Sequence, residues 1–143
     1  MANNNWKNQN RNQDRYEQRE RAVLIEAPLS EHYADKAELY LEGGTAYKAA
    51  ESFRRIAPHQ LRKYLDTIKD CAETTDFTTA RNKLYAIVPM AAYNAGRDKN
   101  QNGLYDFIRS NINKNSIRSE KDIKVLDELF TSIIAYHKYL SGK

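Results

Sequence analysis

The most suggestive polar spacing in the sequence begins at Asp98. The first half of a twelve-residue calcium loop is matched here by Asp98, Asn100, Asn102 and Gly103. Such a loop is closed at its last position by a glutamate that binds the ion through both oxygens, and this chain has Arg109 there. Because a guanidinium offers no acceptor, we interpret the segment as a polar connection between two helices. A calcium sensor remains a third-ranked alternative.

Side chains that commonly carry catalysis or bind metal are scattered along the chain. His32, His59 and His137 lie far apart and form no H-E-x-x-H motif, and neither a P-loop nor a G-x-G-x-x-G motif is present. Cys71 is the single cysteine and falls on an apolar stripe, which excludes an intrachain disulfide and a cysteine metal cage. We therefore predict a protein with no catalytic residue, no metal and no cofactor.

Basic residues supply the remaining pattern. Arg62 and Lys69 are seven residues apart, hence on one side of a predicted helix. Lys63 directly follows Arg62 and lies beside that side of the helix. Spaced cations on rigid helices, with aromatic side chains near them, can follow a phosphate backbone without reading its bases. A solvated basic face is the alternative at this point. The candidate phosphate contacts are Arg62, Lys63, Lys69, Tyr93, Arg97 and Lys99.

Charge is distributed unevenly over the 143 residues, whose formal net charge is +4. Residues 23–52 hold two basic and six acidic residues, and residues 53–99 hold nine basic and five acidic ones. We call the first stretch the acidic shoulder. A chain with one basic region suits a polyanionic partner. No apolar run approaches the ~18 residues of a membrane span, and no secretory signal is present, so we expect a soluble, cytoplasmic protein.

Two parts of the chain differ in composition. Residues 1–22 include six asparagines in the first twelve positions and little apolar content. Such a segment cannot bury enough surface to offset the entropy of ordering it, so we predict a disordered Asn-rich N-terminal arm. Residues 23–143 are long enough for one domain with a modest core. We predict that they form a single helical-bundle domain.

Helical periodicity runs through the rest of the chain. Ser30 is the expected N-cap of a first helix that stops at Gly43 and Gly44. A capping box of Ser119 with Asp122 opens the last helix, whose apolar residues alternate steps of three and four up to Leu140. The fold class predicted is all-α, a compact bundle of five to six helices. Between the first and last helices, four helical segments are expected. They are 45–57, 58–73, 78–96 with a bend or break before Pro89 and a cap at Gly96, and 103–113.

Three blocks occur in a fixed order: QLRKYLDTIK at 60–69, AYNAGRD at 92–98 and IIAYHKYLSGK at 133–143. Together they resemble the small subunit of type III-A CRISPR-Cas effector complexes, the Csm small-subunit family. The resemblance covers about residues 56–143. By resemblance, Arg62 and Lys63 occupy the Arg-Lys of the first block, and Arg97 follows the glycine of the second.

The resemblance implies a compact helical protein without enzymatic activity, which acts in antiviral defence. Copies would self-associate into a minor filament beside the backbone (Csm3-like) and large (Cas10-like) subunits that hold the CRISPR RNA. Their basic face would bind the target RNA strand of the guide-target duplex through its phosphates. His137 and Lys138 occupy the His-Lys of the third block and are further candidates for RNA or subunit contacts. Arg54 and Arg55, which precede the resemblance, are candidates for the same contacts.

Two points stay open at this stage. Arg54 and Arg55 either join the RNA-binding residues or pair with the acidic shoulder. His137 falls on the apolar face of the last helix, which favours a packed, hydrogen-bonded imidazole. The alternative function is a helical protein-protein adaptor that makes no direct contact with RNA.

Overall fold

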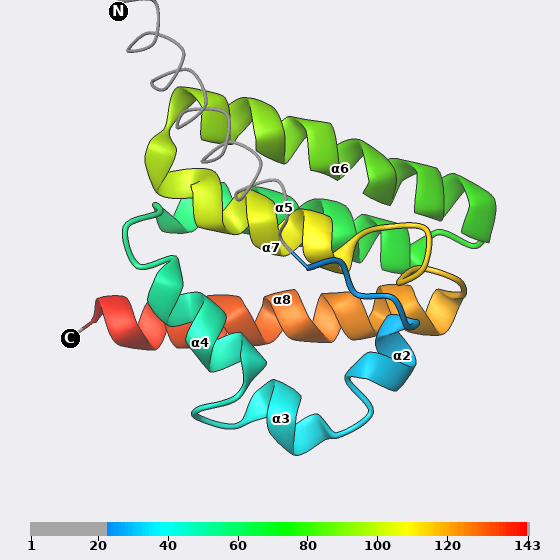
Figure 1. The fold of residues 1–143 in the computed structure, drawn as a ribbon, viewed down its shortest axis with the longest axis horizontal. Helices are drawn as coiled ribbons and strands as arrows, with labels where there is room; N and C mark the ends of the chain where they lie inside the picture. Colours follow the sequence, from blue (N-terminus) through cyan, green and yellow to red (C-terminus); the bar gives the residue numbers. More distant parts are fainter. Residues whose placement is uncertain (1–22, 143) are drawn as a thin grey trace, which may run out of the picture.

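The computed structural model describes residues 23–142 and consists of packed α-helices (Figure 1). No strand occurs within that range, and five of its helices have eight residues or more, so the all-α prediction is confirmed. The predicted arm, residues 1–22, lies outside the described residues. In chain order the elements are α2 (Leu29–His32), α3 (Lys36–Tyr40), α4 (Thr45–Ser52), α5 (Pro58–Glu73), α6 (Phe77–Arg97), the 3-10 turn η1 (Lys99–Gln101), α7 (Asn102–Asn111) and α8 (Glu120–Ser141).

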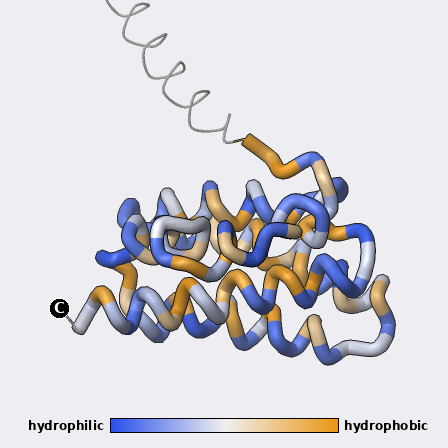
Figure 2. Tube along the Cα trace, turned by 90° about the horizontal axis from the view of Figure 1, so that it is seen from below, coloured by the Kyte–Doolittle hydropathy of each residue, from blue (hydrophilic) through white to orange (hydrophobic). Residues whose placement is uncertain are grey.

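Helix α8 is the central element of the bundle. Helices α4 and α5 both pack against it, α6 packs on α5, and α7 packs on α6 (Figure 1). Hydrophobic and hydrophilic residues alternate along the helices in Figure 2, as one buried side and one solvent side require. The predicted apolar face is confirmed, because the residues that define it are all buried: Ile123, Leu126, Phe130, Ile133, His137 and Leu140.

Helix α6 corrects two boundary predictions. It continues without a break through Pro89 to Arg97, and Gly96 is an ordinary helical residue with no positive φ. Pro89 is exposed, whereas Ala91 and Ala95 are buried on the opposite side of the helix. Burial of that side therefore outweighs the local signals of proline and glycine to end the helix. As a result Arg97 is held on a rigid helix rather than in a loop.

The acidic shoulder also differs from the prediction. Instead of one helix capped by Ser30, the chain forms α2 and α3 with a break at residues 33–35, and Asp35 caps α3 by accepting the Ala37 N–H at 3.0 Å. The break allows Tyr33 to turn inward, where its hydroxyl donates to Asn111 at 2.6 Å. Helix α3 ends at Tyr40, before the predicted stop at Gly43 and Gly44, and Gly43 lies in the following turn with a φ of +83° that is costly for other residues.

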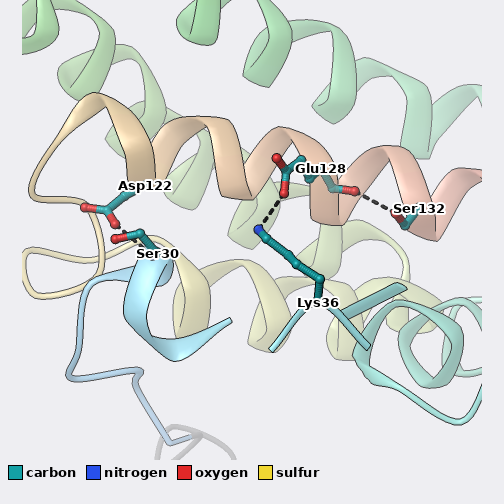
Figure 3. A network of polar contacts seen from close by, with 5 residues as sticks. All are labelled: Ser30, Lys36, Asp122, Glu128 and Ser132. Carbon is teal, nitrogen blue, oxygen red and sulfur yellow. Dashed lines mark hydrogen bonds and ion pairs between the residues drawn. The ribbon is translucent and has the colours of Figure 1, made fainter. Parts of the chain in front are cut away.

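Polar contacts fasten this shoulder to α8 (Figure 3). The Ser30 N–H donates to Asp122 at 2.9 Å, and the Lys36 ammonium pairs with Glu128 at 2.8 Å. The capping box predicted at the start of α8 is confirmed, with Asp122 also accepting the N–H of Ser119.

No helix within residues 23–142 is long and apolar enough to cross a membrane.

Candidate nucleic-acid interface

Most of the predicted site residues gather at one end of the bundle. The turn after α4, the first turns of α5, the end of α6 with η1, and the end of α8 all meet there, at the end marked C in Figure 1. His137 on α8 ties the turn to the bundle, because its Nε2 lies 3.1 Å from the Phe53 carbonyl oxygen. We call this surface the basic end. Its cations are Arg54, Arg55, Arg62, Lys63, Arg97, Lys99 and Lys138, all exposed.

One groove at the basic end lies between α5 and α6 and has a volume of about 330 Å³. We call it the α5–α6 groove; its lining residues are Gln60, Lys63, Asn94, Arg97, Asp98 and Gln101. Two helices therefore present Lys63 and Arg97 to a common space, although the residues are far apart in sequence.

Contacts between the helices keep the α5–α6 groove in shape. The Asn94 Nδ2 donates to the Tyr64 hydroxyl at 2.8 Å, which links α6 to α5. Burial raises the pKa of Tyr64 and outweighs the opposing effect of that hydrogen bond, so the hydroxyl remains protonated at neutral pH. The Arg97 guanidinium carbon lies 5.7 Å from the centre of the Tyr93 ring, and Tyr93 is 64% exposed. An exposed ring beside an arginine offers a stacking surface next to the cations.

A second groove lies on the other side of α5, where it meets α8. Arg62 lines it with Pro58 and Leu61 from α5 and with Ile134, His137 and Lys138 from α8. His137 is buried and faces the Phe53 carbonyl, so the packed-imidazole interpretation is confirmed. Arg62 and Lys63 are therefore neighbours on α5 that line different grooves, and the two grooves flank its first turns.

Lys69 is placed differently from the other candidates. Its ammonium lies 3.1 Å from the Asp127 carboxylate of α8, two turns beyond Arg62 along α5. Within residues 23–142, Arg62, Lys63 and Arg97 form no ion pair. The same holds for Arg54 and Arg55, so this part of the chain contains no pairing between them and the acidic shoulder. The basic end keeps its cations available for an external anion.

Other chemistry finds little support in the described residues. No group of three or more His, Cys, Asp or Glu side chains there is placed to hold a metal ion. Cys71 is buried, and burial together with the neighbouring Asp70 raises the pKa of its thiol, which favours a core role over a nucleophile. The calcium-like spacing belongs to η1 and α7: Asp98 accepts the Asn100 N–H at 3.0 Å, and Gly103 lies inside α7. The polar-connection interpretation fits this arrangement.

Three amide side chains of the α5–α6 groove were missed by the sequence reasoning. Gln60 and Asn94 lie inside two of the recognised blocks but carry no charge, so a search for cations passed over them. Gln101 comes from η1 and is only 3% exposed. Its polar, Asn-rich neighbourhood suggested a surface loop, and nothing local signals that this glutamine is buried.

Comparison with protein families gives a match over most of the chain. A family model described as Csm2 Type III-A matches residues 34–143, which is most of the chain and includes every candidate site residue. Comparisons with curated proteins and with solved structures found no match.

Proposed function

The chain belongs to the Csm2 Type III-A family and is a small subunit of a type III-A Csm complex, and we propose that it binds the target RNA strand through its basic end. In this proposal the protein is a non-catalytic, cytoplasmic component of a CRISPR-Cas ribonucleoprotein that serves antiviral defence. Its task is to position and stabilise the guide-target duplex.

The observation that carries the proposal is the convergence of cations at the basic end. Lys63 and Arg97 come from different helices yet line one groove, and Arg62 lines the groove on the other side of α5. None of the three forms an ion pair within residues 23–142. Phosphates attract such cations whatever the base sequence, so base pairing with the guide is left to select the target.

A single copy should bind RNA weakly. A few phosphate contacts support non-specific binding with a Kd of about 10⁻⁴ to 10⁻⁶ M at physiological salt. Several copies stacked in a minor filament beside the backbone and large subunits would share one ordered strand. Their affinities would then combine through effective concentration, without any new contact. The complex therefore needs cations at a regular spacing more than a strong individual site.

The first prediction concerns the salt dependence of RNA binding. Arg62→Ala and Arg97→Ala should each weaken binding of target RNA for all sequences. Each change should also lower the slope of log affinity against log salt by about 1 for the contact that is lost. The measurement is a salt titration of Csm complexes assembled with each variant, on a guide-matched target RNA.

The matched control is Lys121→Ala, an exposed lysine on α8 outside both grooves at the basic end. Its slope should equal that of the unaltered protein. An unchanged slope in both arginine variants would remove these residues from the interface and would favour the alternative of a helical protein-protein adaptor.

A further inference from the structure

The α5–α6 groove has a composition that phosphate binding alone does not explain. Beside Lys63 and Arg97 it contains three amide side chains and the carboxylate of Asp98. A carboxylate repels phosphate, so a groove made only for a polyanion gains nothing from it. The groove therefore offers hydrogen-bonding groups for a polar part of a ligand other than its phosphates.

Asp98 has a structural role that does not require its charge. Its Oδ1 accepts the Asn100 N–H at 3.0 Å and caps η1. Asparagine caps helices about as well as aspartate and carries no negative charge. What the carboxylate adds is a second, strong acceptor oxygen, and Oδ2 has no hydrogen-bond partner within residues 23–142.

Gln101 supplies an independent observation. It lines the groove, is only 3% exposed, and its Oε1 is shielded from solvent without a hydrogen-bond partner. A buried acceptor oxygen without a partner is costly in a folded protein, and a water, ion or ligand commonly completes such a site. Gln60 lines the same groove, and its side-chain amide has no hydrogen-bond partner in the described residues.

We infer that the α5–α6 groove recognises the ribose of an RNA strand, with Asp98 accepting a hydrogen bond from a 2′-hydroxyl. Lys63 and Arg97 bind the flanking phosphates, and the amides of Gln60 and Gln101 complete the polar contacts of the sugar. A 2′-hydroxyl both donates and accepts, which suits a groove that offers a carboxylate and amides together. DNA lacks that donor, so Asp98 would face its backbone with repulsion alone. The inference rests on the proposed RNA binding and adds selection of RNA over DNA.

Asp98→Asn tests the carboxylate with two duplexes. One guide RNA is paired with a target strand of RNA or of DNA of the same sequence, and the affinity of the purified full-length protein is measured at one salt concentration. The unaltered protein should prefer the RNA target. Asp98→Asn should raise affinity for the DNA target and reduce the RNA-to-DNA ratio by about fivefold, the value of one hydrogen bond.

The control for net charge is Asp66→Asn, which alters an exposed carboxylate of α5 that does not line the groove. It should raise both affinities equally and leave the ratio unchanged. If Asp98→Asn does the same, its carboxylate acts only through charge, and the inference is overturned.

Gln101→Met tests the amide, because methionine has a similar length and no strong hydrogen-bonding group. The expected result is a severalfold loss of affinity for the RNA target with little change for the DNA target. Thermal stability should not fall, since the described structure loses no hydrogen bond. Unchanged RNA affinity together with a higher melting temperature would show a glutamine that is simply unsatisfied.

The same measurements distinguish a failure of the proposed RNA binding from a failure of ribose recognition alone. If the unaltered protein binds neither duplex at concentrations up to about 10⁻⁴ M, the weak limit expected for a single copy, the proposed function fails. If it binds both equally well and with a clear salt dependence, phosphate binding stands and only the recognition of ribose is overturned.

Discussion

The basic end and the acidic shoulder are built in opposite ways. The basic end is assembled from residues between positions 54 and 138 that reach one place because long helices begin or end there. The shoulder is continuous in sequence, and its α2 and α3 have only four and five residues. Its lysine Lys36 is paired with Glu128, whereas Arg62, Lys63 and Arg97 form no ion pair within residues 23–142. Charges at the shoulder therefore help to attach it to α8, and charges at the basic end remain available for a partner.

The largest expected effect is on the attachment of the shoulder. Asp122 is fully buried and accepts N–H groups from Ser30, Arg118 and Ser119 at 2.9, 2.8 and 3.0 Å. Asp122→Ala would leave these donors without an acceptor and should lower the free energy of unfolding by about 3 kcal/mol. Urea unfolding measures the change. Asp127→Ala is the control, because that carboxylate is in an exposed ion pair and should cost less than about 1 kcal/mol.

The same carboxylate gives the shoulder a pH dependence. Burial alone would raise the pKa of Asp122, but the backbone hydrogen bonds from Ser30, Arg118 and Ser119 outweigh it and leave the pKa lowered. Since the unfolded state then binds the proton more readily, this contribution is present above the unfolded pKa of about 4 and is lost as pH falls through the folded pKa. Asp122→Ala should lose less stability between pH 7 and pH 3 than the unaltered protein. Equal losses would contradict this assignment.

Charge reversal compares the two regions directly. Arg54→Glu with Arg55→Glu should weaken target RNA binding by roughly tenfold, because two phosphate contacts become repulsive. Glu38→Lys with Glu42→Lys changes the net charge by the same amount in the other direction, but should alter affinity less than about twofold at 0.15 M salt, where charges are screened beyond ~8 Å.

Binding titrations at that salt concentration measure both pairs. If reversal at the shoulder strengthens binding as much as reversal at Arg54 and Arg55 weakens it, RNA responds to the overall field of the protein and the basic end has no special role.

How far the sequence could anticipate these regions depends on which interactions are local. The bounds of α5 and the capping box of α8 were predictable, because their signals lie within a few residues of each other. The continuity of α6 through Pro89 was not, since burial of one helix side decided it. The break between α2 and α3 depends on Tyr33 reaching Asn111, a contact 78 residues away in sequence.

The candidate site shows the same division between local and distant interactions. Recognised blocks indicated Arg62, Lys63 and Arg97, but not that Arg62 and Lys63 line different grooves. The burial of Gln101 also could not be predicted, because it depends on how η1 packs against α6 and α7.

The smallest expected effect concerns Lys69, which has the right spacing from Arg62 to bind RNA but is already in an ion pair. Spacing alone groups Lys69 with Arg62, since the residues are seven apart on α5, but the structure pairs Lys69 with Asp127 at 3.1 Å. A cation must leave such a pair to bind phosphate, so Lys69→Ala should weaken RNA binding less than about twofold and leave the salt slope nearly unchanged. Asp127→Asn releases Lys69 and should strengthen binding slightly, and combining it with Lys69→Ala should abolish that gain. If Lys69→Ala lowers the slope as much as Arg62→Ala does, the ion pair opens at no cost, and the interface extends two turns along α5.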